Sequence, residues 1–436
     1  MLLWAGRQNK EWIVKPPDDG CAELARSLKV SPLTAQVLIN RGITDNKQGN
    51  VFLRPRLTEL IEPDRMPGIK PAVERIKEAL ANKEKITIYG DYDVDGITGV
   101  SILWQVLRLL GGSVDYYIPH RIDEGYGLNI EAIESLAKSG ANLLITVDCG
   151  ITAFESAKLA NELGIDLIIT DHHQIIDEGN GKPPKVPHAL AIVHPSLDKS
   201  YPNQDSAGAM VAFKLAWAIA NEFSSGARLQ PEIREFMLCA TSLAAMGTIA
   251  DIVDLRGENR VLTSFGLKAL PDSKLSGIQA LLETLGLIGQ KLDSFHIGFR
   301  LAPMLNAAGR MGHARLAVEL LTSESQARSM QIAQYLKEQN DQRQKVERRM
   351  LKEAVEMIVH RNLNHPDRKS IVLACENWHV GVIGIVASRI VDRYHRPTIL
   401  LGLPPNNEKS DSGVGERIIA QGSARSIPGF SMISGL

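Results

Sequence analysis

The chain has 436 residues, 44% hydrophobic and 23% charged, which indicates a folded protein of two or three domains and excludes whole-chain disorder, collagen-like repeats and a coiled-coil rod. Its 49 Lys and Arg residues balance 50 Asp and Glu residues for a net charge of -1, so any basic surface for nucleic acid must be local. Four cysteines without CxxC spacing argue against a disulfide framework and a thiolate zinc site, and no apolar run reaches the length of a membrane span, so we expect a cytoplasmic protein.

The chain begins with a segment, residues 1–70, that we expect to be a helical lead-in. Helical spacing covers 22–30 and 32–40, and three prolines then mark an irregular stretch. From residue 71 to 322 the pattern changes to short β-branched runs that alternate with helix-like segments. The expected strands are 85–91, 113–119, 142–148, 166–171 and 189–194, and the helices between them include 98–110, 130–139 and 153–163.

Apolar strands separated by helices of this length predict a parallel sheet with right-handed crossovers. The expected fold class is therefore α/β, with a doubly wound parallel sheet in a catalytic domain over 71–322. Within it, 205–290 reads as mostly helical.

The last part of the chain is expected to begin a second, smaller α/β domain. A charged segment, 323–361, is polar all round in its middle and reads as a helix connecting the two domains. Residues 370–376 and 397–403 are expected strands on either side of a helix over 384–394. We expect the second domain, 362–436, to be incomplete and without an OB-fold.

A first acidic cluster follows the strand at 85–91 in the sequence GDYDVDG, residues 90–96. Alternate residues of an extended chain point the same way, so Asp91, Asp93 and Asp95 are expected to face one another. Their repulsion is costly unless a cation binds, although a solvated turn explains the residues equally well. An EF-hand is excluded because its twelfth position is Ile102 and the loop follows a strand.

Three more clusters carry carboxylates or histidines. Asp148 ends one predicted strand, Asp171-His172-His173 ends the next, and Asp251 lies in GTIADIVDL, where alone it reads as a helix cap. Carboxyl ends of parallel strands meet at one edge of the sheet, so we expect these groups to converge. An oxygen-rich set with one or two imidazoles suits Mn²⁺ or Mg²⁺, and so many carboxylates suit two ions that together hydrolyse phosphate esters.

At this point the motifs resemble a known family. GDYDVDG, VDCG, TDHH and GTIADIVDL, in this order, resemble the four motifs of the DHH phosphoesterase superfamily. FLRPRLTEL (52–60), PHRIDEGYGLN (119–129), RLAPMLNAAGRMG (300–312), WHVGVIGIVASRI (378–390) and GSARSIPGF (422–430) are similar to the RecJ-type single-strand-specific 5′→3′ DNA exonucleases.

The resemblance implies a role for each matching residue. The implied metal ligands are Asp93, Asp95, Asp148, His172 and Asp251, with Asp148 bridging two ions and Asp91 either a further ligand or the partner of one. His173 would face the scissile phosphate. The implied phosphate-binding residues are Arg121, Asn306 and Arg310 along the strand, and Ser423, Arg425 and Ser426 at the 5′-terminal phosphate.

Two of these segments also carry a local prediction. Residues 303–315 show no clear helix or strand period and are expected to be loop-like, so that Arg310 could bind an oxyanion beside the metals. The alternative is a helix with arginines on its surface. GSARS, 422–426, combines small residues with hydroxyls and an arginine, a composition that suits a phosphate nest. Tyr92, Tyr126 and Trp378 could stack on bases but read better as packing residues.

The sequence therefore predicts a two-metal 5′→3′ exonuclease that hydrolyses single-stranded DNA to 5′-mononucleotides in repair and recombination. Alternatives are a phosphoesterase for short oligonucleotides or cyclic dinucleotides, and a non-catalytic replication or repair scaffold. The cofactors would be two Mn²⁺ or Mg²⁺ ions. The partners would be single-stranded DNA, a single-strand-binding protein and a helicase, with no membrane, and the chain would act as a monomer.

Overall fold

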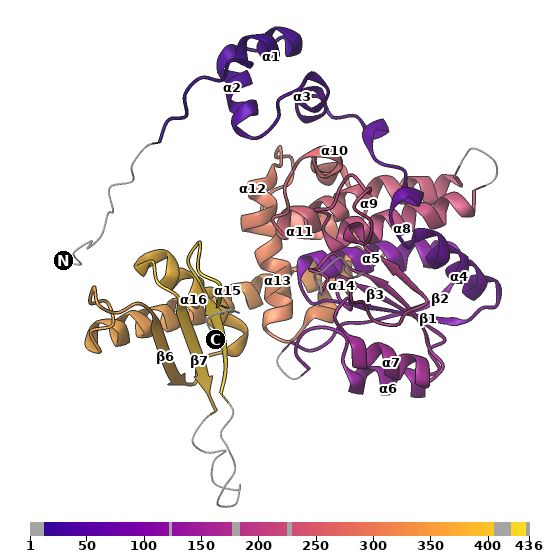
Figure 1. Ribbon diagram of the computed structural model, residues 1–436. Coiled ribbons are helices and arrows are strands. Elements are labelled where there is room, and N and C mark those ends of the chain that lie inside the picture. The colour runs from indigo at the N-terminus through magenta and orange to yellow at the C-terminus, as the bar shows by residue number, and fades with distance from the viewer. Residues whose placement is uncertain (1–12, 122–123, 177–183, 225–228, 405–419, 433–436) are drawn as a thin grey trace, which may run out of the picture.

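The structure is a computed structural model that describes residues 13–121, 124–176, 184–224, 229–404 and 420–432. Figure 1 shows an N-terminal group of small helices, a large α/β body and a smaller domain, with the long helix α15 running from the body to the smaller domain. The N-terminal helices have a small apolar core of their own, around Leu28, Leu38 and Ile43. They are α1 (Cys21–Leu28), α2 (Pro32–Asn40) and α3 (Asn46–Leu53), followed by the turns η1 (Leu57–Glu59) and η2 (Pro63–Arg65).

The α/β body is built on a five-stranded sheet in which every pairing is parallel. Its strand order is β2-β1-β3-β4-β5. This confirms the predicted fold class, a doubly wound parallel sheet. The strands are β1 (Lys85–Gly90), β2 (Ser113–Tyr117), β3 (Leu143–Val147), β4 (Asp166–Thr170) and β5 (Ala191–Val193).

Successive residues of a strand point to opposite faces of the sheet, and the strands carry apolar residues on both faces. Helices therefore cover both faces. In β1, Ile86 and Ile88 belong to the core on one face, whereas Tyr89 belongs to the core on the other. The first face packs on α4 (Ile69–Ala81), α5 (Val94–Leu109) and α8 (Gly208–Glu222); the second packs on α6 (Ile130–Lys138) and α7 (Phe154–Glu162), seen below the sheet in Figure 1.

The strand order reverses between β1 and β3. The chain passes from β1 outward to β2, and then returns to the other side of β1 to form β3. The crossovers therefore diverge there, and in open α/β sheets such a switch point leaves a crevice beyond the carboxyl ends of the strands. Asp91 and Asp148 directly follow these two strands.

A helical layer completes the body. Its helices are α9 (Pro231–Ala250), α10 (Gly257–Ala269), α11 (Ser276–Thr284), α12 (Ser294–His296), α13 (Ala302–Arg310) and α14 (Ala314–Thr322), with the short 3₁₀ turns η3 (Pro195–Leu197) and η4 (Leu270–Asp272) and the π-helical segment η5 (Ile297–Leu301). Among the described residues, α9 alone is long and apolar enough to cross a membrane, but 72% of the relevant stretch is buried inside the protein. It is a core helix.

The prediction that 303–315 is loop-like is wrong, because α13 covers Ala302–Arg310. Pro303 occupies its first turn, where a proline costs no hydrogen bond. Its buried residues, Met304, Leu305, Ala307 and Ala308 among them, lie on more than one face. The less buried residues, Pro303, Asn306 and Arg310, follow at helical spacing on the remaining side, so the helical period is present in the sequence but is carried by only these positions.

The smaller domain follows α15 (Gln326–His360) and contains β6 (Ile371–Glu376), α16 (Val380–Tyr394), β7 (Thr398–Leu403) and β8 (Gln421–Arg425). β6 and β7 are parallel, and β8 joins β7 as an antiparallel strand. The nest predicted at 422–426 is therefore not formed: residues 422–425 belong to a strand whose backbone pairs with β7. A strand of small polar residues carries no apolar alternation by which the sequence could reveal it.

Candidate metal centre

Four segments bring acidic and imidazole side chains together at the carboxyl ends of β1, β3 and β4. Ligand atoms lie within 4.8 Å of one another in three overlapping groups, namely Asp91-Asp93-Asp148, Asp95-His172-Asp251 and Asp148-His172-His173. The predicted ligands thus converge in space, with Asp148 and His172 each in two groups.

The acidic residues after β1 divide between two of these groups, unlike the single face predicted for an extended chain. The backbone turns helical at Val94, because the carboxylate of Asp93 caps α5 by accepting hydrogen bonds from the amides of Asp95 (2.9 Å) and Gly96 (3.2 Å). Asp95 therefore lies in the first turn of the helix and points toward His172, whereas Asp91 stays at the strand end.

Asp95 is fully buried and held by the backbone of a different helix. The amides of Gly208 and Ala209, at the start of α8, donate to its two carboxylate oxygens at 2.5 and 2.9 Å. Helix N-termini favour anions in this way. A side chain at position 208 would collide with the cluster, since a Cβ atom there would lie 2.7 Å from Asp148 Oδ1.

Asp148 leaves β3 in a left-handed backbone conformation, with φ at 62°. Asp tolerates this region better than most residues, and such outliers persist where the surrounding structure enforces them. Asp148 Oδ1 lies 3.0 Å from His172 Nε2. Nε2 of the same histidine lies 3.6 Å from Asp95 and 3.7 Å from Asp251, which ends α9 as its C-cap.

The second histidine of the pair is oriented differently. Its Nδ1 lies 2.8 Å from Asp171 Oδ1. The same oxygen accepts hydrogen bonds from the backbone amides of His172 and His173, and the other oxygen accepts one from the amide of Ile151. Nε2 of His173 lies 3.1 Å from the hydroxyl of Tyr126. The side chain of His173 is 45% exposed, and it borders a cavity of about 450 Å³ that also includes Ser196 and Lys199.

The electrostatics of the cluster indicate a missing positive charge. Burial, followed by the charge of Asp93, raises the pKa of Asp91 to about 8 and that of Asp251 to about 6. Burial and the neighbouring carboxylates also raise the pKa of Asp95 and Asp148 well above the usual range. Burial, followed by the charge of His173, lowers the pKa of His172 to about 4, so its imidazole is neutral at pH 7.

Three buried atoms of the cluster lack a hydrogen-bond partner among the described residues: Asp91 Oδ1, Asp148 Oδ1 and His172 Nε2. Buried polar atoms are rarely left unsatisfied, and each costs about 1–3 kcal/mol. All three can offer a lone pair, so cations bound to the groups that contain them would satisfy all three. The donor set, mostly carboxylate oxygen with imidazole, fits Mn²⁺ or Mg²⁺.

The predicted phosphate-binding residues of the body lie around Arg310. Arg310 is half-buried at the end of α13, and its Nη1 donates to the carbonyl of Gly381 in the smaller domain at 3.1 Å. Burial, then the charges of Arg121 and Arg343, lower the pKa of Arg310 to about 10, so it is charged at neutral pH. Arg121 lies over the ring of Tyr92, 4.7 Å from its centroid. Asn306 Oδ1 accepts from the amide of Val94 and so supports the start of α5.

The predicted residues of the smaller domain lie on or next to β8. Ser423 accepts a hydrogen bond from Arg425 at 2.8 Å, and the hydroxyl of Ser426 donates to the carbonyl of Phe430 at 2.7 Å. Both Ser423 and Arg425 pack against Gly384 on α16. They are therefore part of a different domain from the acidic cluster.

Three groups that support or contact the acidic cluster were missed or misread in the sequence. The amides of Gly208 and Ala209 carry no side-chain signal, although a Gly-Ala pair opening an apolar helix is a position where such amides are accessible. Asp171 stands in the TDHH motif but was given no role. Tyr126 was interpreted as a packing residue, yet it is 54% exposed and contacts His173.

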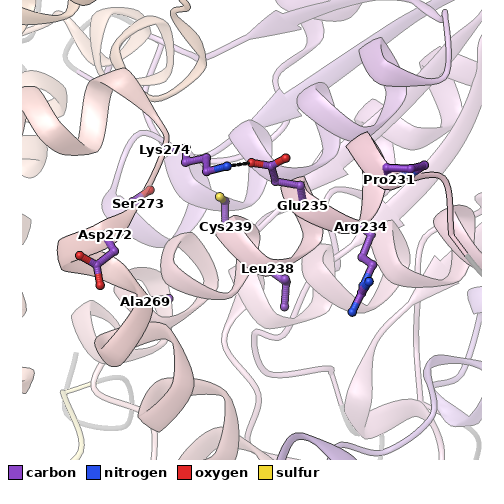
Figure 2. Close-up of a pocket in the computed structure, with 9 residues that line it drawn as sticks. All are labelled: Pro231, Arg234, Glu235, Leu238, Cys239, Ala269, Asp272, Ser273 and Lys274. Atoms are coloured by element: carbon purple, nitrogen blue, oxygen red, sulfur yellow. Dashed lines mark ion pairs between the residues drawn. The ribbon is translucent and has the colours of Figure 1, made fainter.

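A separate surface cavity of about 530 Å³ lies at the N-terminal end of α9 (Figure 2). Leu238 and Cys239 line it, together with an ion pair between Lys274 and Glu235. Asp251 is at the opposite end of this 20-residue helix, twelve residues beyond Cys239, or about 18 Å at 1.5 Å per residue. None of the predicted metal or phosphate-binding residues lines this cavity.

Comparison with known proteins agrees with this geometry. The model of the DHH family, N-terminal domain, matches residues 85–241. The chain is 40% identical over 427 residues to the single-stranded-DNA-specific exonuclease RecJ of Bacillus subtilis, covering 98% of this chain and 50% of that protein. It is 35% identical over 419 residues to the RecJ of Haemophilus influenzae, covering 94% and 68%.

A solved structure is also similar. The crystal structure of RecJ in complex with Mn²⁺ from Thermus thermophilus matches 89% of this chain and 53% of its own, with a TM-score of 0.74 and 33% sequence identity. The chain thus spans about half the length of the Bacillus and Thermus relatives.

Proposed function

Because the chain belongs to the RecJ family of single-stranded-DNA-specific exonucleases, we propose that it hydrolyses single-stranded DNA from the 5′ end in a reaction that requires Mn²⁺ or Mg²⁺. The observation that carries this proposal is the convergence of five carboxylates and two histidines in one cluster. Three buried atoms of this cluster have no hydrogen-bond partner among the described residues. The Thermus thermophilus relative was solved with Mn²⁺ and with Mg²⁺, which agrees with this donor chemistry.

The three groups of ligand atoms support two ions. Asp91 and Asp93 would hold one ion, Asp95, His172 and Asp251 would hold the other, and Asp148 would lie between them. Two divalent ions lower the pKa of water and neutralise charge on a phosphodiester. The amides of Gly208 and Ala209 keep Asp95 in place, so this ligand requires no reorganisation when an ion binds.

His173 would bind the scissile phosphate. Its contact with Asp171 fixes the ring and raises its pKa, so that the imidazole can donate a hydrogen bond from Nε2 to a phosphate oxygen. Nε2 lies 3.1 Å from the hydroxyl of Tyr126, and His173 borders the adjacent cavity, where a phosphate would have access to it. Arg310, with Arg121 close by, would bind the same strand through its guanidinium.

A terminal phosphate would be held across the domain boundary. Ser423, Arg425 and Ser426 would bind the 5′ phosphate of the strand, while the acidic cluster cleaves the next bond and releases a 5′-mononucleotide. A site that holds the chain end by charge reads no base, which agrees with a nuclease that does not depend on sequence. We also propose that the chain acts as a monomer in the cytoplasm, on strands supplied by a helicase and a single-strand-binding protein. Its four free cysteines fit a reducing compartment.

The test is a nuclease assay on 5′-phosphorylated single strands labelled at the 3′ end. With Mn²⁺ we expect labelled strands that shorten progressively and free 5′-mononucleotides, and with excess EDTA no cleavage. Asp148→Asn should lose at least about 10³-fold in rate, whereas Asp64→Asn, an exposed surface aspartate, should match the unmodified protein. Activity in EDTA would refute the metal-dependent mechanism, and a preference for dinucleotides over long strands would favour a small-substrate phosphoesterase.

A further inference from the structure

The connecting helix α15 carries a buried carboxylate, Glu347, which is 4% exposed. One of its oxygens accepts from Arg343 Nη1, one turn earlier on the same helix, at 2.8 Å. The other oxygen lies 2.5 Å from Nη2 of Arg389, which belongs to α16 in the smaller domain. A carboxylate between two guanidinium groups forms strong charge-assisted hydrogen bonds. Glu347 therefore joins the connecting helix to the smaller domain.

A second contact holds the other end of α16 against the same helix. Trp378, directly before α16, donates from Nε1 to Glu353 of α15 at 2.9 Å. Glu353 lies farther along α15 than Glu347, and Trp378 lies before Arg389 in the chain, so the two helices run in opposite directions. Two contacts fix both the place and the tilt of α16 against α15.

α16 is also the element through which the two proposed phosphate sites contact each other. Near its start, the carbonyl of Gly381 accepts from Arg310 of the body at 3.1 Å. One turn later, Gly384 faces β8, where an added Cβ would lie 3.1 Å from both Ser423 Oγ and Arg425 Nη2. A tilt of α16 would therefore move β8 relative to Arg310.

Glu347 also offsets positive charge near Arg310. Arg310 is half-buried near Arg121 and Arg343, whose positive charges oppose its own and contribute to its lowered pKa. Glu347 directly contacts Arg343 and offsets that charge. Without Glu347, Arg343 would be a buried, uncompensated cation next to the proposed phosphate path.

We propose that Glu347 is a positioning residue, which through Arg389 fixes α16 so that the terminal-phosphate site on β8 stands at one distance from the acidic cluster. This inference rests on the proposed function. The distance between the two sites decides which phosphodiester bond reaches the acidic cluster, so it sets both the preference for a 5′ phosphate and the length of the product.

The experiment compares Glu347→Gln and Arg389→Met with the unmodified protein. Glu356→Gln is the matched control, because Glu356 lies on the same helix in an exposed pair with Lys352. Affinities for 5′-phosphorylated and 5′-hydroxyl single strands are measured by fluorescence anisotropy in EDTA. We expect the unmodified protein and the control to prefer the phosphorylated strand, and both variants to lose about tenfold of that preference, the effect of one strong hydrogen bond.

Affinity for the hydroxyl strand should stay unchanged in Arg389→Met, which keeps the contact between Glu347 and Arg343, and this separates positioning from a general loss of structure. Arg389 is 56% exposed, so Arg389→Met decides the question if Glu347→Gln does not fold. Equal loss on both strands, an unchanged preference in the variants, or no preference in the unmodified protein would overturn the inference. Absence of Mn²⁺-dependent cleavage by the unmodified protein would instead refute the proposed function, since the affinities in EDTA need no catalysis.

Discussion

Oδ1 of Asp148 and Nε2 of His172 lie 3.0 Å apart at the ends of two neighbouring strands, and neither atom has a hydrogen-bond partner among the described residues. The low pKa of His172 leaves its imidazole neutral at pH 7, and in the tautomer that carries the proton on Nδ1 both atoms present lone pairs to the same space. Lone pairs at this separation repel each other unless a positive charge lies between or beside them. A bound metal ion would supply that positive charge.

Metal binding should change how the stability of the protein depends on pH. The pKa of Asp91 is raised to about 8 by burial and by Asp93, so the stability that its protonation contributes is fully present below its unfolded pKa of about 3.8 and is lost as pH rises through about 8. We therefore expect the melting temperature in EDTA to fall between pH 5 and pH 9, and the rise caused by Mn²⁺ to be largest at pH 9. Differential scanning fluorimetry measures both. Asp91→Asn should flatten the EDTA profile; a metal effect that does not vary with pH would contradict this account.

Gly208→Ala should weaken metal binding strongly although none of the proposed ligands is changed. The added methyl group would lie 2.7 Å from Asp148 Oδ1, closer than real Cβ contacts, and would displace either the ligand or the amide that donates to Asp95. Titration calorimetry with Mn²⁺ should show at least about a 10²-fold weaker affinity. The matched control is Gly298→Ala, where an added Cβ meets no other atom within 4 Å. Equal Mn²⁺ affinity in the two variants would show that position 208 tolerates a side chain.

Asp171→Asn should lower kcat about 10²-fold with little change in KM, because Asp171 orients His173 without touching the substrate. In Asp171, Oδ1 accepts hydrogen bonds from the backbone amides of both histidines and from the imidazole of His173, and Oδ2 accepts one from the amide of Ile151. An asparagine has only one accepting oxygen, so it cannot keep all of these hydrogen bonds. Steady-state cleavage of labelled single strands measures both constants. Asp198→Asn is the control, since Asp198 is exposed and its carboxylate accepts a hydrogen bond from the backbone amide of the nearby Ser200. A rise in KM at constant kcat would place Asp171 in strand binding instead.

Lys214 and Glu258 form a fully buried ion pair at 2.6 Å, and Glu258 also accepts from the hydroxyl of Tyr201 at 2.7 Å. Lys214→Met leaves Glu258 buried and unpaired, which should cost about 3–5 kcal/mol of stability. The double variant Lys214→Met/Glu258→Gln removes the charge as well and should recover part of that loss. Urea unfolding followed by circular dichroism measures the difference. A double variant less stable than Lys214→Met would contradict the expected coupling.

The parts of the fold that the sequence predicted are those encoded locally. Strands such as 142–148 are continuous apolar runs, because a parallel strand is covered on both faces, and five of them separated by helices specify a doubly wound sheet. The ends of those strands meet at one edge, so the approach of Asp148, His172 and Asp91 could be inferred before any coordinates were known.

Only the tertiary structure showed how these side chains divide between the ligand groups and what supports them. The turn at Asp93 sends Asp95 away from Asp91, a choice made by a helix cap rather than by alternation. The donors to Asp95 are backbone amides, which every residue possesses, so no letter of the sequence marks them. Glu347 reads as one more charge on a polar helix until Arg389, forty-two residues later, lies beside it. Local patterns determine which elements form, but contacts between distant segments depend on how those elements pack, and that information lies in no single stretch of the chain.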